Sequence, residues 1–166
     1  MTHSGFDPSL TPEERLHALG IMLPSPPKPA AYYLPYKRVG DQLWISGQIA
    51  VRGGSLVHEG LVGGDVDLEG AQECARACAI NLITQAKEAL GELSRVKQIV
   101  KISVFVASKG GFSDQHLVAN GASELLAQVF GEAGRHARSA VGVASLPLSS
   151  PVEIEAVFEV DRSAHV

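Results

Sequence analysis

The stretch "VKQIVKISVFVAS", residues 96–108, decides how this chain folds. It is rich in valine, isoleucine and phenylalanine, and its apolar residues alternate along the chain. This pattern predicts a long β-strand. Ile102, Val104 and Val106 share one face of that strand, and Phe105 lies on the other. The strand is therefore expected to bury at least one face.

A helical pattern lies on each side of this strand. Residues 68–91 repeat small apolar side chains at helical spacing, with Asp67 in the capping position before them and Gly91 at their end. Residues 114–131 form a second such pattern, for which Ser113 is the expected cap. Small side chains allow a helix to lie close to a sheet.

Further strands are expected at both ends of this core. A hairpin turning at Gly40 and Asp41 precedes the first long helix, and residues 138–147 and 152–160 form the last two strands. Helices that alternate with strands in one small domain indicate an α+β fold, a mixed β-sheet with two helices packed on one face. The other face is then either wet or covered by another subunit.

The N-terminal segment has a different composition. Residues 10–20 predict a short helix, in which Thr11 and Glu14 form a capping box. A proline-rich, extended segment follows. We therefore divide the chain into an N-terminal helix and Pro-rich extension, residues 1–29, and a single domain, residues 30–162.

Composition excludes several classes of protein. The chain has 166 residues and a formal net charge of −4, which argues against a basic surface for nucleic acid. It contains no apolar stretch of about 20 residues, so we expect no membrane span. Cys74 and Cys78 are the two cysteines, four residues apart, and we interpret them as buried core residues and not as metal ligands. Such sparse cysteine favours a reducing, cytoplasmic location.

Four stretches occur in an order and spacing that resemble the YjgF/RidA family of reactive-imine deaminases, in a longer-chain branch. They are "VGDQLWISGQI", "VKISVFVAS", "ARSAVGVASLP" and "VEIEAVFEV", and Asn81 also fits the family pattern. The resemblance covers residues 30–160. It implies a chorismate-mutase-like fold and a homotrimer with three clefts between subunits, which would cover the second sheet face. It implies no metal and no organic cofactor.

The resemblance assigns the catalytic roles to two residues. Arg138 stands where the family has the arginine that binds the substrate carboxylate, and a guanidinium suits that group because it can donate two parallel hydrogen bonds. Glu153 matches the acid that positions or activates the attacking water. Taken from the residues alone, a surface arginine and a solvated strand face would be the favoured interpretations of these two residues. If the last two strands pair antiparallel, residues 138 and 153 come nearly opposite each other.

The same resemblance assigns further substrate-binding residues. They are Tyr33, Gly47, Asn120 and the backbone at Ala140, beside Arg138 itself. Tyr32 and Tyr36 are near rivals of Tyr33 for its position.

The resemblance implies hydrolytic deamination of reactive 2-imino or enamine acids to 2-oxo acids and ammonia, as in a 2-iminobutanoate/2-iminopropanoate deaminase. The alternative is a trimeric module that binds small carboxylates such as 2-oxo acids without turnover. A ribonuclease is a third reading, which the acidic balance disfavours. His116 and His136 are the histidines near the proposed cleft segments, and they form no pair suited to phosphodiester cleavage.

Overall fold

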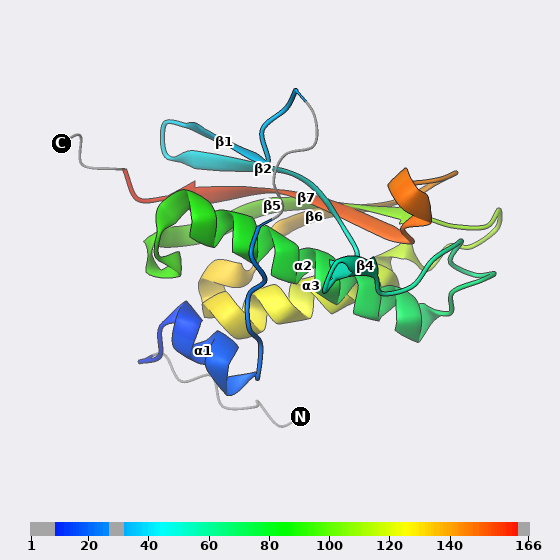
Figure 1. Ribbon diagram of the computed structural model, residues 1–166, viewed down its shortest axis with the longest axis horizontal. Helices are drawn as coiled ribbons and strands as arrows, with labels where there is room; N and C mark the ends of the chain where they lie inside the picture. The colour runs from blue at the N-terminus through cyan, green and yellow to red at the C-terminus, as the bar shows by residue number, and fades with distance from the viewer. Residues whose placement is uncertain (1–8, 27–31, 163–166) are drawn as a thin grey trace.

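The computed structural model describes residues 9–26 and 32–162 (Figure 1). The helices are α1 (Pro12–Ala18), α2 (Leu68–Leu90) and α3 (Gln115–Phe130), and the short 3-10 helices are η1 (Leu93–Arg95), η2 (Gly131–Gly134) and η3 (Pro147–Ser149). The strands are β1 (Tyr36–Val39), β2 (Gln42–Ile49), β3 (Val51–Arg52), β4 (Ser55–Leu56), β5 (Val96–Ala107), β6 (Ala137–Val143) and β7 (Val152–Val160).

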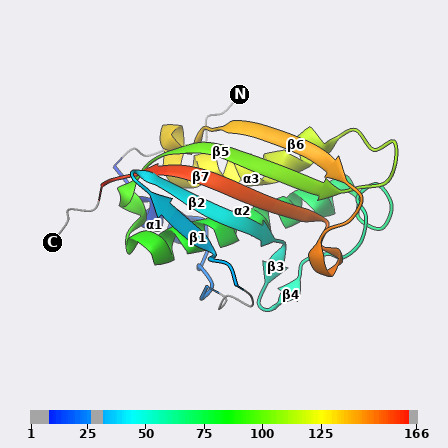
Figure 2. The same ribbon diagram turned by 90° about the horizontal axis from the view of Figure 1, so that it is seen from above.

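The strands form a mixed sheet in the order β1-β2-β7-β5-β6, and β3 and β4 form a small separate hairpin. All neighbours in the large sheet are antiparallel except β5 and β6, which run parallel. Helices α2 and α3 lie side by side on one face of this sheet (Figure 1). The opposite face is open along all five strands (Figure 2). The expected α+β fold is confirmed.

The core fills the space between the sheet and the two long helices. The alternation predicted for β5 is confirmed, since Ile102, Val104 and Val106 are buried on the helix side. On α2 the side chains that face the sheet are small, and Cys74 and Cys78 are both fully buried, as expected for core residues. Burial raises the pKa of the Cys74 thiol to about 11, which keeps it protonated and unreactive.

Two of the three expected helix caps are confirmed. Thr11 and Glu14 form the capping box of α1. Asp67 accepts a hydrogen bond from the backbone of Gly70 at the start of α2. Ser113, however, does not cap α3. The residue at the cap position is Asp114, which makes no side-chain cap bond. The loop before α3 is closed instead by the Gln115 amide, which donates to the Phe112 carbonyl at 2.8 Å.

Helix α1 is attached to the body by polar contacts and one buried side chain. The Glu13 carboxylate accepts from Lys87 Nζ at 2.7 Å and from the Leu93 backbone at 2.8 Å. Arg15 Nη1 donates to the Val129 carbonyl at 3.0 Å, and Leu16 is buried. We call residues 20–26 the strap, because they run from α1 across α2 and α3 toward β1 (Figure 1). The rest of the extension, residues 1–8 and 27–29, lies outside the described residues, and the division at residue 29 stays a prediction.

Within residues 9–26 and 32–162, the structure contains no helix that combines the length and the hydropathy needed to cross a membrane.

The close approach of α2 and α3 depends on Gly121. A Cβ atom built on Gly121 would lie 2.2 Å from the carbonyl oxygen of Gln72 and 2.9 Å from its carbonyl carbon. These are backbone atoms of the neighbouring helix, so they cannot rotate away as a side chain would. The two helices can therefore keep their present separation only while residue 121 lacks a side chain.

We predict that Gly121→Ala destabilises the protein by about 2 kcal/mol, because the helices have to separate. An ordinary helix interior would gain about 1 kcal/mol from the same change, so the sign is diagnostic. The measurement is the free energy of unfolding in urea. Gly110→Ala is the matched control, since a Cβ there meets nothing within 4 Å; equal stability of the two variants would contradict the prediction.

Candidate active site

The residues singled out from the sequence lie in two separate groups. The first, which we call the arginine group, consists of Arg138 and Ala140 on β6 and Asn120 on α3. The second, which we call the glutamate group, consists of Gly47 on β2, Glu153 on β7 and Tyr33 ahead of β1. Each group has its own geometry.

Arg138 leaves the edge of the sheet toward α3. It pairs with Ile102 of β5 and therefore shares the helix side of the sheet with that buried residue. Its Nη1 donates to Asn120 Oδ1 at 2.9 Å and to Ser123 Oγ at 3.1 Å, and its Nη2 donates to the His116 carbonyl at 3.1 Å. The structure thus brings Arg138 and Asn120 together, as expected.

The Arg138 guanidinium is oriented but its charge is not neutralised. Among the described residues it makes no ion pair. Of its five N–H groups, three donate to α3. The two that remain, on Nε and Nη2, suffice for the two oxygens of one carboxylate. An exposed cation held in place by neutral groups is well prepared for an anionic ligand.

Two residues beside Arg138 were missed as site residues in the sequence. Ser123 Oγ lies 3.0 Å from His136 Nε2, and His136 Nδ1 lies 2.6 Å from the Gly134 carbonyl oxygen. The pKa of His136 is lowered, chiefly by burial and further by the positive charge of Arg138. The hydrogen bond to the Gly134 carbonyl acts in the opposite direction and raises it. The three side chains of Ser123, His136 and Arg138 line an open hollow of about 330 Å³. The available signal was spacing, because Ser123 follows Asn120 by one helical turn.

The glutamate group is built around a β-bulge. The β2–β7 register pairs Ile45 with Ala156 and then Gln48 with Ile154, so β2 carries one extra residue at this point. Gly47 lies in the bulge, and a Cβ on it would come 2.0 Å from Glu153 Oε1. With any other residue at 47, the Glu153 carboxylate would have to turn away from its present position against β2.

The Glu153 carboxylate is half-buried and lies near a second carboxylate, that of Glu155. Burial raises its pKa above 4.5, and the negative charge of Glu155 raises it further. A carboxylate of raised pKa is a stronger base than one in water, which suits a group that takes a proton from a water molecule.

Tyr33 faces the same hollow as part of this group. It lines a hollow of about 650 Å³ together with Gly47 and Gln48. Tyr32 is fully exposed, and Tyr36 lies on β1 opposite Ile45. Pro24 and Ser25 of the strap line the same hollow, so the N-terminal extension contributes to its wall.

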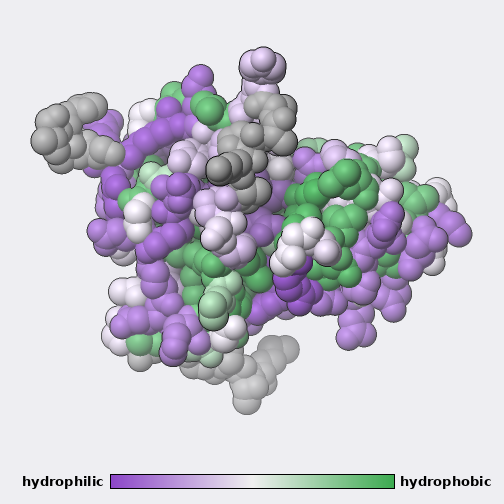
Figure 3. All heavy atoms as spheres, viewed as in Figure 1, coloured by the Kyte–Doolittle hydropathy of each residue, from purple (hydrophilic) through white to green (hydrophobic). Residues whose placement is uncertain are grey.

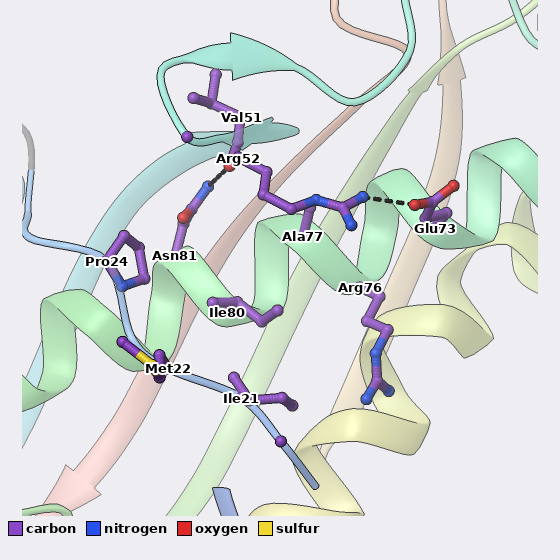
Figure 4. Close-up of a pocket in the computed structure, with 12 residues that line it drawn as sticks. Ile21, Met22, Pro24, Val51, Arg52, Glu73, Arg76, Ala77, Ile80 and Asn81 are labelled. Atoms are coloured by element: carbon purple, nitrogen blue, oxygen red, sulfur yellow. Dashed lines mark hydrogen bonds and ion pairs between the residues drawn. The ribbon is translucent and has the colours of Figure 1, made fainter. Parts of the chain in front are cut away.

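A second hollow, of about 410 Å³, adjoins the first and shares Pro24, Val51 and Asn81 with it. The strap and α2 form its two sides, and Arg52 reaches across it to Glu73 at 2.5 Å (Figure 4). Hydrophobic residues gather on this face of the molecule (Figure 3). None of the proposed catalytic residues lines this second hollow.

Within one chain the two groups do not meet. The expected antiparallel pairing of the last two strands is wrong, because β5 lies between β6 and β7. Arg138 pairs with Ile102 and Glu153 with Phe105, three residues farther along β5 and on the other face of the sheet. Strand spacing and rise place their Cα atoms roughly 14 Å apart.

The described residues, 9–26 and 32–162, contain no group of three histidine, cysteine, aspartate or glutamate side chains arranged for a metal ion.

Comparison with known proteins shows where the chain belongs. Protein TCP17 of Trypanosoma cruzi is 46% identical over 148 residues, 89% of this chain and 92% of its own. A 2-iminobutanoate/2-iminopropanoate deaminase of Dermatophagoides farinae is 28% identical over 141 residues, 85% of this chain and 95% of its own. The crystal structure of Atu1372 from Agrobacterium tumefaciens, a protein of unknown function, matches with a TM-score of 0.85 at 49% identity, over 91% of this chain and 94% of that one.

The family model described as "YjgF/chorismate_mutase-like, putative endoribonuclease" matches residues 13–159, nearly the whole described chain. The resemblance found in the sequence is thereby confirmed, and the chain belongs to the YjgF/chorismate mutase-like family.

Proposed function

We propose that this protein hydrolyses reactive 2-imino acids, or their enamine tautomers, to 2-oxo acids and ammonia, in clefts between the subunits of a homotrimer. One observation carries the proposal. A cation prepared for a carboxylate and a carboxylate prepared as a base lie in one chain but face apart. The deaminase of Dermatophagoides farinae supports the reaction class. The two unpaired, buried cysteines fit a reducing compartment such as the cytoplasm.

The open sheet face supports assembly. It carries Trp44, which is 52% exposed, and Val141, which is 47% exposed. Phe105 and Val157 lie half-buried between them on neighbouring strands. An apolar face of this extent is typical of a surface that another subunit covers. In the trimer, the Arg138 edge of one subunit lies against the Glu153 side of the next, and each of the three clefts takes one group from each neighbour.

The reaction needs only these groups. Arg138 binds the substrate carboxylate and holds the imine carbon in register. Glu153 accepts a proton from a water molecule as the water oxygen attacks that carbon, and returns it to the nitrogen. Glu153 then moves the hydroxyl proton of the resulting aminol to its nitrogen, the C–N bond breaks as the C=O bond forms, and ammonia and the 2-oxo acid are released. The backbone at Gly47 and Ala140 approaches the substrate closely because neither residue has a large side chain.

A module that binds 2-oxo acids without turnover is the alternative, and it uses the same arginine. It is distinguished by thermal stabilisation with 2-oxobutyrate in the absence of any imine turnover.

We predict that Arg138→Ala lowers kcat/KM by at least roughly 30-fold, because a carboxylate loses its charged partner, at a cost of about 2 kcal/mol or more. An amino-acid oxidase generates the imine, and semicarbazide traps it. Hydrolysis of the imine by the protein lowers the rate of trapping, and this decrease measures the turnover. Arg135→Ala is the matched control, since the Arg135 side chain is exposed and, within the described residues, its ion pair is with Glu132 at 3.5 Å and not with the Arg138 partners. Equal loss in both variants, or none in Arg138→Ala, would contradict the assignment.

A mixing experiment tests whether the cleft lies between subunits. Arg138→Ala and Glu153→Gln, each inactive alone, are unfolded together in equal amounts and refolded. Random trimers then contain intact clefts, because one subunit supplies Arg138 and its neighbour supplies Glu153, and we predict recovery of about a quarter of the wild-type activity. A mixture of Arg138→Ala with Arg138→Lys is the control, because both kinds of subunit lack Arg138 and no combination of them restores a cleft. No recovery in the first mixture would place the site within one chain.

We predict that the rate falls as the pH drops through the raised pKa of Glu153, because the protonated acid cannot take a proton from water. Replacing Glu155 by glutamine removes the negative charge that raises this pKa. The acid limb of the pH–rate profile therefore moves to lower pH in Glu155→Gln. Glu159→Gln, on the same face but farther along β7, is the control. An unmoved acid limb in Glu155→Gln would show that another group limits the rate.

A further inference from the structure

Behind Arg138 the structure contains a connected series of hydrogen bonds that the reaction itself does not use. It runs from the Gly134 carbonyl to His136 Nδ1 at 2.6 Å, from His136 Nε2 to Ser123 Oγ at 3.0 Å, and from Ser123 Oγ to Arg138 Nη1 at 3.1 Å. The same Nη1 continues to Asn120 Oδ1 at 2.9 Å. The series therefore links the backbone carbonyl of Gly134, at the end of η2, to the guanidinium.

Each hydrogen bond in the series determines the direction of the next. A carbonyl oxygen only accepts, so the hydrogen of a neutral His136 lies on Nδ1. Nε2 then has no hydrogen and accepts from the Ser123 hydroxyl. The Ser123 oxygen consequently directs a lone pair at Arg138 Nη1, whose N–H can only donate. The low pKa of His136, caused by burial and by the charge of Arg138, favours this neutral form.

Three contacts from a single face of α3 hold the guanidinium. The His116 carbonyl, Asn120 and Ser123 are spaced four and three residues apart, so they lie in one row along the helix. A long, exposed arginine would otherwise sample many rotamers and lose that freedom on binding. Orientation before binding reduces this loss and improves the alignment of a reactant.

We propose that Ser123 and His136 are positioning residues, which hold Arg138 in the orientation that binds the substrate carboxylate. This assignment rests on the proposed function of Arg138 but concerns residues that touch no substrate. It also makes the arginine dependent on the protonation of a histidine.

The surroundings of His136 determine the sign of that dependence. The charged side chains that line its hollow are Glu124 from α3, Arg135 from the segment before β6, and Arg138 from β6 itself. Arg135 is also paired with Glu132 of η2. When His136 gains a second hydrogen, Nε2 becomes a donor, the Ser123 hydroxyl has to turn away, and two cations lie on either side of one oxygen. A drop in pH therefore weakens the hydrogen bond between Ser123 and Arg138 and makes the guanidinium less ordered.

The test measures the orientation of Arg138 directly, through the ¹⁵N order parameter of its Nε–H group in the full-length protein without ligand. We expect an ordered group in the wild type, and a marked fall in Ser123→Ala and His136→Asn. The His136→Asn side chain can still donate to the Gly134 carbonyl but does not reach Ser123. Ser123→Thr keeps the hydroxyl and should restore the order. In the wild type the order parameter should fall as the pH drops through the lowered pKa of His136, because His136 becomes protonated, and His136→Asn should lack this change.

The second readout is the dissociation constant of 2-oxobutyrate, measured by calorimetry in the same variants. We expect it to rise about tenfold in Ser123→Ala and His136→Asn and to stay within about twofold in Ser123→Thr. Ser94→Ala and His17→Gln are the controls, since both side chains are exposed and remote from β6.

The outcomes separate the two proposals. If Arg138 is equally ordered in the wild type, Ser123→Ala and His136→Asn, the positioning role is overturned, whatever the activity. If the order parameter falls as expected while the wild type neither binds 2-oxobutyrate nor hydrolyses imines, the positions of Ser123 and His136 stand and the proposed substrate of Arg138 is wrong. If order and affinity fall together and Ser123→Thr restores both, the proposal is supported in full.

Discussion

The position of β5 in the sheet is the constraint on which the rest of the structure depends. It pairs antiparallel with β7 and parallel with β6. As a result β6 becomes an edge strand and presents Arg138 toward α3, while β7 lies inside the sheet and presents Glu153 on the open face. A single choice of neighbours therefore sends two reactive groups in different directions. Under the proposed function, this is why two copies of the chain are needed to complete one site.

The glutamate and arginine groups are prepared in different ways. Glu153 is made more basic by burial and by the charge of Glu155. Arg138 is oriented by neutral oxygens and keeps its charge unpaired. The first arrangement costs some stability in the isolated chain, because it holds a carboxylate in a partly buried place, whereas Arg138 is exposed and makes no ion pair within the described residues. Strained or unpaired groups of this kind are typical of sites where a ligand supplies the missing partner.

Much of the fold could be predicted from the sequence because helices and strands depend on local patterns of apolar, capping and glycine residues. Alternation identified the buried faces of β5 and β7, and caps and glycines located α1 and α2 to within a residue. Strand order could not be predicted in this way, because periodicity gives the face of a strand and says nothing about its neighbours. The last two strands are adjacent in the chain, and that adjacency led to the wrong pairing. The bond between Ser123 and His136 was missed for a related reason, since it depends on how α3 packs beside β6.

The bulge in β2 has a consequence for how this protein can change over generations. A side chain at position 47 conflicts with the present rotamer of Glu153, because Glu153 Oε1 occupies the space where the Cβ of residue 47 would lie. The two positions are therefore epistatic. A chain that loses the acid at 153 is released from the need for glycine at 47, and the bulge then becomes free to fill with a side chain. An acid that returned at 153 beside such a side chain would have to take another rotamer, so recovery of the present geometry would require a change at both positions.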